Sequence, residues 1–297
     1  MRFLNSTAGR LSRHRRSPLA GLAVLLIGLF AMGGLYSVLG PAQAHEGKTD
    51  EELISQGREL FIAGCSSCHG ENGEGITTVR GENVGPSLIG VGAAAVDFQV
   101  STGRMPMAAP GPQAPRKRPV YSEEETLAMA AYVASLGPGP GIPTEADYSL
   151  DTYLNSLPAD EREAARQEAI RLGGEIFLSN CSACHNFEGS GGAMPNGGYA
   201  PNLHGVDEKH IYEAMLTGPH NMPSFSNGSL TQENKRDVIA YLKSVQEAPG
   251  YGGFSLGGLG PVSEGLFAWV LGIGGCVGFA VWIAAHTTRT DKKKVSA

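Results

Sequence analysis

The middle of this 297-residue chain contains few basic residues. Of 23 basic and 29 acidic side chains, residues 1–16 hold five arginines and no acid, and residues 286–297 hold four bases and one acid. Residues 17–285 therefore carry 14 bases against 28 acids, which gives this stretch a net charge of −14. Because no basic stripe lies in the part of the chain that can fold, the sequence predicts no nucleic-acid interface. Basic ends around an acidic middle indicate membrane topology instead.

The chain also lacks the composition of a disordered or fibrous protein. Hydrophobic residues make up 41% of it, and it shows neither a collagen-like period nor low-complexity tracts. Its length allows one large domain or two small ones. Glycine, with 42 residues, stands at about twice its usual share, which predicts much loop.

Two uncharged apolar segments frame the chain. Residues 17–44 hold no charged side chain, and the stretch Leu19–Leu39 within them has the length of a membrane span. The tripeptide Ala42-Gln43-Ala44 is an acceptable signal cleavage site, so a retained anchor and a cleaved signal sequence both remain open. In either case the basic N-terminal flank stays in the cytoplasm and the residues that follow are exported.

The second apolar segment, Gly265–Ala285, favours a transmembrane helix over a buried core helix. It contains 21 uncharged residues, and Arg289 and Lys292–Lys294 follow it. The positive-inside rule then predicts that the tail 286–297 is cytoplasmic and that residues 45–263 lie on the outer face of the cell membrane.

Four of the five cysteines form two C-x-x-C-H motifs, Cys65–His69 and Cys181–His185. Each motif is the signature of c-type haem attachment. Two thiols one helical turn apart can add to the vinyl groups of one porphyrin, and the adjoining histidine then lies beneath the iron as its proximal ligand. The sequence thus predicts two covalently bound haem c groups. Their thioether residues are Cys65, Cys68, Cys181 and Cys184, and their proximal ligands are His69 and His185.

Other uses of these cysteines explain less. A zinc site built from both pairs would close a loop of 112 residues, where about 15–20 is usual, and would leave both histidines without a role. A thioredoxin-like dithiol or a pair of disulfides does not need the histidine either. The fifth cysteine, Cys276, lies within the second apolar segment, where it is expected to be a small buried apolar residue.

Both motifs lie in copies of one small domain. Gly57–Ile62 matches Gly173–Leu178 at an offset of 116 residues, directly before the two motifs. We expect each copy to begin and end with a helix, with glycine- and proline-rich loops between them, and Ser122-x-x-Glu125 to cap the closing helix of the first copy. Further features follow in the same order at nearly fixed spacing, which indicates an internal repeat. They are Pro86, Leu88 and Gly90 with Pro201, Leu203 and Gly205; Met105-Pro106 with Met222-Pro223; and Ala130–Leu136 with Ile239–Val245.

The two copies resemble class I cytochrome c. They share the pattern G-x-x-[LI]-[FI]-x-x-x-C-x-x-C-H, a downstream P-x-L-x-G, a Met-Pro dipeptide and a closing helix that carries an aromatic residue. The resemblance implies a mainly α fold of two tandem class I cytochrome c domains. It also implies that the methionine before proline is the distal ligand of the haem iron, so that Met105 pairs with His69 and Met222 with His185.

Each distal methionine has a rival. Met107 follows Met105 by two residues, and Met194-Pro195 is a second Met-Pro nine residues after His185. The register of the repeat favours Met105 and Met222, because neither rival has a counterpart in the other copy. Bis-histidine ligation is a further alternative, but its candidates are unmatched and are expected at the surface: His204, His210 and His220.

The resemblance also implies supporting roles for matched residues. The backbone carbonyls of Pro86 and Pro201 are expected to accept the second ring N–H of the proximal histidines. Tyr132 and Tyr241, at matched positions of the closing helices, either pack on the haem or make an ordinary contact with the core. The run Ala109–Pro119 has no match in the second copy and is expected to be a solvated excursion, with a docking loop for a partner subunit as the alternative.

The chain as a whole resembles the dihaem cytochrome c subunit of actinobacterial quinol:cytochrome c reductases, the cytochrome bcc complexes. That resemblance rests on the order of its segments. They are residues 1–44, a basic region with an anchor or signal sequence; 45–137 and 150–248, the two cytochrome c domains; 138–149 and 249–264, linkers; 265–285, the transmembrane helix; and 286–297, the basic tail.

This resemblance implies a membrane-anchored electron relay in a proton-translocating respiratory chain. Electrons would pass from the Rieske iron–sulfur protein to a haem-copper terminal oxidase, with the cytochrome b subunit as a further partner. The chain would be a subunit of an oxidoreductase and translocase without a substrate-transforming site of its own. Two alternatives remain: an electron-transfer subunit of another membrane dehydrogenase or oxidase, and a dihaem peroxidase, which needs one iron without a distal ligand.

Overall fold

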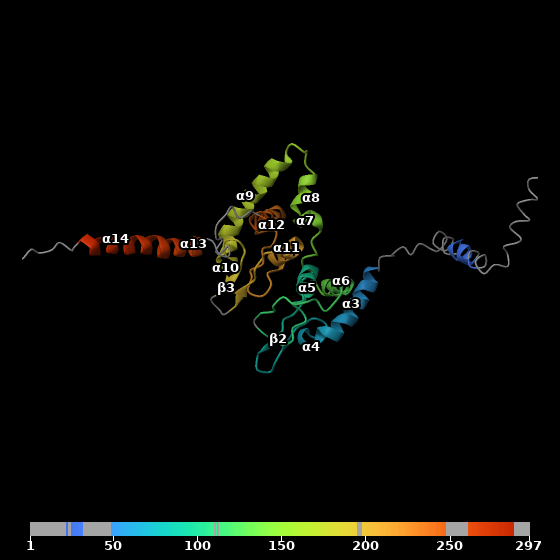
Figure 1. Cartoon of the computed structure of the whole chain (residues 1–297). Helices are drawn as coiled ribbons and strands as arrows, with labels where there is room; N and C mark the ends of the chain where they lie inside the picture. Colours follow the sequence, from blue (N-terminus) through green and yellow to red (C-terminus); the bar gives the residue numbers. More distant parts are fainter. Residues whose placement is uncertain are drawn as a thin grey trace, which may run out of the picture. The chain divides into compact units, whose positions relative to one another are not determined.

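The computed structural model describes residues 22, 25–31, 49–109, 111, 113–194, 198–247 and 261–287. It divides the chain into a unit Met1–Thr49 and a unit Asp50–Ala297. The described residues of the second unit are mainly helical, with two short antiparallel strand pairs (Figure 1). The mainly α fold that the resemblance implies is therefore confirmed.

The first repeat is built from three main helices joined by loops. The predicted capping box is present: the Ser122 hydroxyl accepts a hydrogen bond from the N–H of Glu125, and the Glu125 carboxylate accepts one from the N–H of Ser122. Val133 of the closing helix packs with Phe61 of the opening helix, and each is 1% exposed. The elements are α3 (Asp50–Gly64), α4 (Ser66–His69), β1 (Ile76–Thr77), β2 (Asn83–Gly85), α5 (Ala93–Ser101) and α6 (Glu123–Ser135).

The second repeat has the same plan, with two short helices before it. One of them, α7, lies within segment 138–149, which the sequence predicts to be a linker. The buried core of the repeat joins α9, α11 and α12 and includes Phe177, Ile211 and Leu242. The elements are α7 (Glu145–Tyr148), α8 (Leu150–Asn155), α9 (Arg162–Asn180), α10 (Ser182–His185), β3 (Gly192–Ala193), β4 (Tyr199–Ala200), α11 (Glu208–Thr217) and α12 (Gln232–Glu247).

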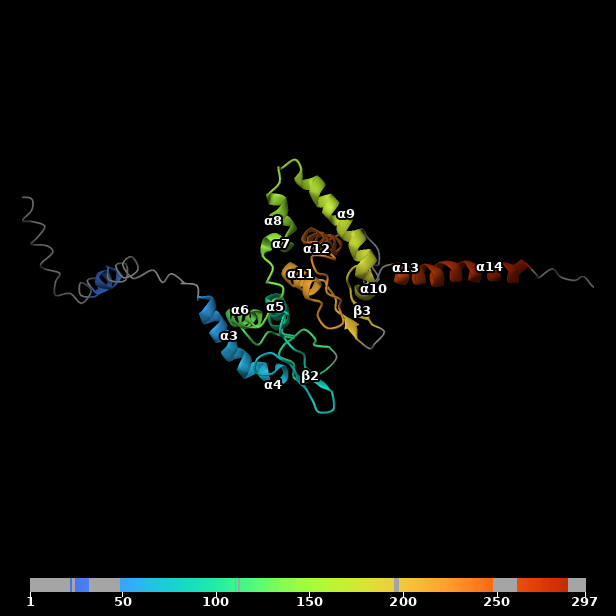
Figure 2. The same ribbon diagram turned by 180° about the vertical axis from the view of Figure 1, so that it is seen from behind.

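A matched glycine lets the opening and closing helices touch in each repeat. Helix α3 packs on α6, and α9 packs on α12 (Figure 2). A Cβ atom on Gly57 would overlap the backbone carbonyl of Ala128, and one on Gly173 would overlap the carbonyl of Asp237. Gly57 and Gly173, which open the two matched blocks of sequence, are therefore needed because the backbones of the two helices touch at these positions.

Adding a methyl group at this contact should destabilise the repeat. We expect Gly173→Ala to lower the free energy of unfolding by about 1–3 kcal/mol, because the two helices must separate to make room. Gly228→Ala is the matched control, since a Cβ there would meet nothing closer than the Ser226 hydroxyl at 3.8 Å. Thermal unfolding followed by circular dichroism measures both variants, and equal midpoints for the two would contradict this account of the contact.

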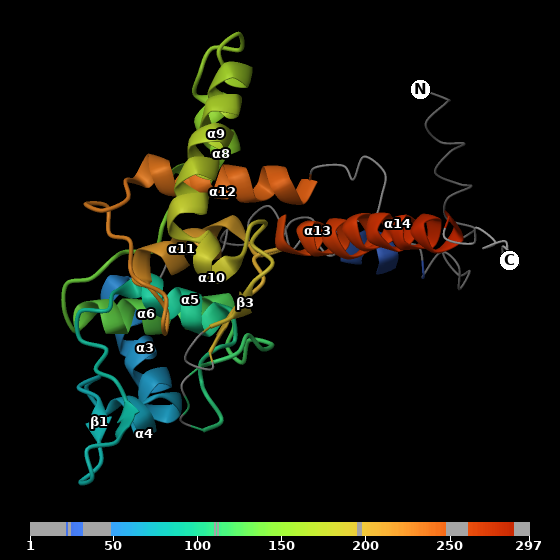
Figure 3. The same ribbon diagram turned by 90° about the vertical axis from the view of Figure 1, so that its left-hand side faces the viewer.

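The two repeats meet through helices that occupy the same place in each copy. Helix α5 of the first repeat lies beside α11 of the second (Figure 3). The Asp97 carboxylate, 2% exposed, pairs with the Lys209 ammonium. Nearby, the Ser101 hydroxyl lies 3.0 Å from Nε2 of His210. The repeats are thus joined by polar contacts around the buried Asp97, although the sequence predicts no helix at α5 or α11.

Glu213 makes the stability of this contact depend on pH. Its side chain is 0% exposed, and burial raises the pKa of its carboxyl far above the ordinary 4.5, with the Asp97 carboxylate raising it further. Because the folded-state pKa lies above the unfolded one, folding takes up a proton, and this stabilising contribution is present below pH 4.5 and is lost as the pH rises.

The variant Glu213→Gln should remove that dependence. We expect it to become progressively more stable than the unmodified chain as the pH rises from 4.5 towards the folded-state pKa of about 10, with the difference growing by at most about 1.4 kcal/mol per pH unit. Denaturant titrations at a series of pH values measure the slope. Glu59→Gln, at an exposed position of α3, serves as the control and should leave the slope as it is. Parallel curves for the unmodified chain and Glu213→Gln would refute the buried neutral carboxyl.

The C-terminal helix has the properties of a membrane span. Its parts are continuous along the chain: α13 (Pro261–Phe267), the π-helical stretch η2 (Ala268–Ile273) and α14 (Gly274–Thr287). The segment Glu264–Ala285 has a hydropathy of 2.1 in its most apolar window, of which 0% is buried, and it is the one helix among the described residues long and apolar enough to cross a membrane. The expectations for the cleavage site at Ala42–Ala44 and for the lysines of the tail lie outside the described residues.

Candidate functional site

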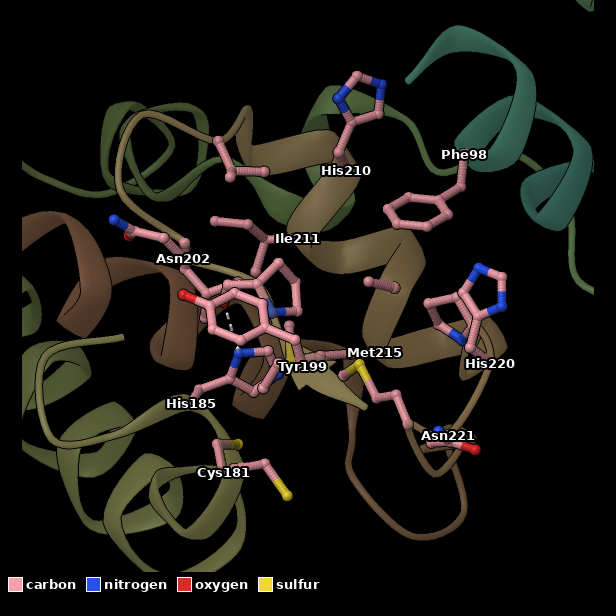
Figure 4. A pocket seen from close by; sticks show the side chains of 18 of the residues that line it. Phe98, Cys181, His185, Tyr199, Asn202, His210, Ile211, Met215, His220 and Asn221 are labelled. Carbon is pink, nitrogen blue, oxygen red and sulfur yellow. Dashed lines mark hydrogen bonds between the residues drawn. The ribbon is translucent and has the colours of Figure 1, made fainter. Parts of the chain in front are cut away.

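The second C-x-x-C-H motif lies on a single helical turn. Helix α9 ends at Asn180, and the N–H of His185 then donates to the carbonyl of Cys181 at 2.9 Å. This turn brings the Cys181 and His185 side chains to the same side of a cavity (Figure 4). The first motif repeats the turn, with the N–H of His69 donating to the carbonyl of Cys65 at 3.0 Å. Both motifs therefore form the same backbone turn, with the second cysteine and the histidine on one short helix and the first cysteine directly before it.

The cavity beside the second motif is large enough for a cofactor. Its volume is about 460 Å³, within the range of pockets that hold cofactors. Its wall is largely apolar and combines residues of α5, α9, α10, α11 and α12 with the loops around them. Apart from the motif itself, the apolar wall includes Leu203, Ile211, Met215, Met222, Phe225 and Leu242.

Each proximal histidine is oriented by a proline carbonyl. Nδ1 of His69 lies 2.8 Å from the carbonyl oxygen of Pro86, and Nδ1 of His185 lies 3.1 Å from that of Pro201. A carbonyl can only accept, so Nδ1 carries the proton and Nε2 keeps its lone pair for a metal. These are the contacts that the family resemblance implies, and the structure confirms them.

The protonation of His185 also suits a metal ligand. The side chain is 9% exposed, and burial lowers the pKa of its imidazole below the ordinary 6.5, while the hydrogen bond to Pro201 acts in the opposite direction. A neutral imidazole is the form that coordinates iron.

The first cysteine of each motif is half-buried. Burial raises the pKa of Cys65 and of Cys181 to about 11, and the second cysteine of each motif adds to the shift. A reactive dithiol depends on a thiolate, which this raised pKa disfavours. Among the residues that the structure describes, no group of three or more histidine, cysteine or acidic side chains could hold a metal ion by itself. The motifs therefore fit a haem better than a zinc ion.

The methionines near the cavity are more numerous than the sequence predicts. Met222 packs against the core of the second repeat and lines the cavity, but Met194 and Met215 line it too. Met215 belongs to the buried core of α11. In the first repeat Met105 is half-buried, and its N–H donates to the carbonyl of Gln99 at 2.9 Å. The assignment of Met105 and Met222 as distal ligands stays a prediction.

The unmatched histidines have three different environments. His204 is exposed, as expected, and its Nε2 lies 2.8 Å from the carbonyl of Glu188. The prediction of a surface position is wrong for His210, which is half-buried between α5 and α11, lines the cavity and packs edge-on against Phe98 at 6.3 Å. His220 is exposed at the edge of the same cavity.

Most of the described residues in the unmatched run of the first copy are exposed, as expected, but the run is also anchored on the second repeat. Within it, Ala114 is 2% exposed, and the Gln113 side-chain oxygen accepts the N–H of Tyr199 at 3.1 Å. The run thus closes one side of the cavity of the second repeat with Ala114, Pro115 and Arg116. Sequence reasoning missed this because the run has no periodic pattern and its contact lies 86 residues away.

The matched tyrosines make core contacts. The ring of Tyr132 lies 5.2 Å from that of Phe61, and the ring of Tyr241 lies 5.5 Å from that of Phe177. Both hydroxyls donate to loop carbonyls, at 3.4 Å to Glu71 and at 3.3 Å to Phe187. Of the two expectations, the structure favours the ordinary contact with the core.

Comparison with known proteins identifies the same two repeats. The family model "Cytochrome c" matches residues 54–137, and the model "Cytochrome C oxidase, cbb3-type, subunit III" matches residues 168–242. Both matches contain a C-x-x-C-H turn, and cytochrome c domains imply haem c as the cofactor.

Relatives of similar length carry the same printed name. The "Cytochrome bc1 complex cytochrome c subunit" of Corynebacterium efficiens is 46% identical over 93% of this chain and 92% of its own. That of Mycobacterium tuberculosis is 44% identical over 95% and 96%. A weaker relative, the "Cbb3-type cytochrome c oxidase subunit FixP" of Bradyrhizobium diazoefficiens, is 26% identical over 77% and 75%. With two cytochrome c repeats, two oriented histidines and this likeness over almost the full length, the chain belongs to the family of cytochrome bc1 complex cytochrome c subunits.

Proposed function

We propose that this chain is a membrane-anchored dihaem cytochrome that relays electrons from the Rieske protein of a quinol:cytochrome c reductase to a haem-copper terminal oxidase. The observation that carries the proposal is the pair of C-x-x-C-H turns, each with its histidine held by a proline carbonyl, in a member of this family. Cytochrome b and the Rieske protein are its proposed partners within the reductase.

The proposed site residues divide into two roles. Cys65 and Cys68 would attach one haem c, and Cys181 and Cys184 would attach the second. His69 with Met105, and His185 with Met222, would hold the two irons from both sides and leave no position for oxygen or peroxide. Bound haem supplies reversible one-electron oxidation and reduction, and a methionine ligand raises its potential.

The two repeats are arranged for transfer inside one chain. Helices α5 and α11 join them through the buried pair of Asp97 and Lys209, so an electron passing between the repeats does not wait for two molecules to meet. In this proposal residues 45–137 and 150–248 are the two haem domains on the outer face of the membrane. The helix within 265–285 anchors them, and the tail 286–297 is cytoplasmic.

Haem stoichiometry and partners test this proposal. The tagged chain, extracted from membranes in mild detergent, should carry two haem c groups by the pyridine haemochrome assay. Cytochrome b and Rieske subunits should purify with it. One haem per chain would contradict the dihaem assignment, and a chain that purifies alone would contradict the assignment to the complex.

A second function has some support from the comparisons. The likeness of residues 168–242 to cbb3-type subunit III, together with the relative FixP, favours an electron-transfer subunit of an oxidase. Identification of the co-purified subunits separates the two functions, because this alternative predicts an oxidase core without Rieske protein. A dihaem peroxidase would instead bind cyanide at one haem of the unmodified chain.

A further inference from the structure

Two arginines of the first repeat line the cavity of the second. Arg104 follows α5 and is half-buried, and Arg116 lies exposed on the run that closes one side of the cavity; both contribute to the wall of the cavity that holds the second C-x-x-C-H motif. The Arg104 guanidinium lies over the Phe98 ring, 4.5 Å from its centroid. Neither arginine forms an ion pair with any residue in the described part of the chain.

The acidic groups nearest to this interface are already engaged. Asp97 pairs with Lys209, and Glu213 is fully buried, where burial favours its neutral form. Two neighbouring cations at the wall of an apolar cavity, without a carboxylate from the protein, are free to bind an anion that the cavity receives. Arginine is the side chain best shaped to hold a carboxylate.

The position of the arginines matches the chemistry of an attached haem. In Figure 4, Phe98 lies on the side of the cavity away from Cys181, and Arg104 stacks on Phe98. A porphyrin that is joined to a protein through its vinyl groups has its two propionates on the opposite edge of the ring. The cysteines and the arginines thus lie where the two ends of one haem c need them.

We propose that Arg104 and Arg116 of the first repeat bind the propionates of the haem attached to the second repeat. The inference rests on the proposed function, since it requires that second haem. The first repeat then completes the haem site of its neighbour, and the hydrogen bond between Gln113 and Tyr199 anchors the run that carries Arg116 on the second repeat. Positive charge at the propionates disfavours the ferric state. The arginines therefore raise the reduction potential of the second haem above that of a haem whose propionates have no cationic partner.

The test measures both haem potentials in the full-length chain with haem bound. A spectroelectrochemical titration resolves two one-electron waves, one for each haem. The variant Met222→His assigns them, because the wave that it displaces belongs to the second haem. Arg116→Gln should lower that wave and leave the other unchanged. Arg104→Gln should lower it as well, but Arg116 gives the cleaner result because Arg104 directly precedes Met105.

Matched variants separate charge from folding. Arg116→Lys keeps the cation and should restore most of the potential. Arg118→Gln, on the same run but outside the cavity, should leave both waves unchanged. Unchanged waves in both Arg104→Gln and Arg116→Gln, or an equal shift in Arg118→Gln, would overturn the inference while the dihaem proposal stands. A chain without a second wave would instead overturn the dihaem proposal itself.

Discussion

Replacing Cys181 and Cys184 together by alanine is expected to halve the covalent haem content and to reduce quinol-dependent oxygen consumption to background. Each C-x-x-C-H turn can attach only its own haem, since the two pairs lie 112 residues apart and on separate repeats. A relay with one of its two carriers missing has no path between reductase and oxidase. Haem staining of the purified chain and an oxygen electrode measure the two effects.

The fifth cysteine provides the control for this experiment. Cys276 lies in the exposed C-terminal helix, away from both motifs in the sequence. Cys276→Ala should keep two haems per chain and the full rate of oxygen consumption. If the double variant retains two covalent haems, or if it retains the rate with one haem, the second motif is not the site of the relay.

Replacing Met222 by alanine is expected to open one iron to external ligands and to lower its potential. The thioether favours the reduced iron, so its loss lowers the potential. In the reduced state this variant should bind carbon monoxide at one haem per chain, whereas the unmodified chain should bind none. Difference spectroscopy under carbon monoxide measures the stoichiometry.

The corresponding variant of Met194, the alternative distal ligand, shows whether carbon monoxide binding is specific to the loss of Met222. Met194 lines the same cavity, so its contacts do not exclude it as a ligand. Met194→Ala should leave both irons closed to carbon monoxide, because the register of the repeat assigns the ligand to Met222. The reverse outcome, in which Met194→Ala opens the iron and Met222→Ala does not, would reassign the distal ligand.

The chemistry of the site could be predicted from sequence because it is local or repeated. The spacing of Cys181, Cys184 and His185 is a property of one helical turn, and the matched Pro201 follows its histidine by 16 residues, against 17 for Pro86 in the first copy. The match between Gly57 and Gly173 has an equally simple explanation, because two helices cross closely at this position in each repeat.

The contacts between the repeats could not be predicted in this way. Helices α5 and α11 are nine and ten residues long, and their buried faces include Asp97 and Glu213, so neither shows a simple apolar stripe. The strand pairs have only two or three residues per strand, which is too short for an alternating pattern. The run that holds Arg116 has no repeat partner, and its place beside the second cavity depends on tertiary contacts alone.

The central claim is that electrons pass through both repeats of this chain on their way from quinol to oxygen. Stopped-flow spectroscopy of the detergent-solubilised complex tests it most directly. A quinol is first mixed with the complex in the absence of oxygen, and oxygen is then admitted. We expect two c-type haems per chain to become reduced before oxygen is admitted and both to be reoxidised once it is present. C-type haems that stay oxidised while quinol is consumed, or that stay reduced while oxygen is consumed, would contradict the relay.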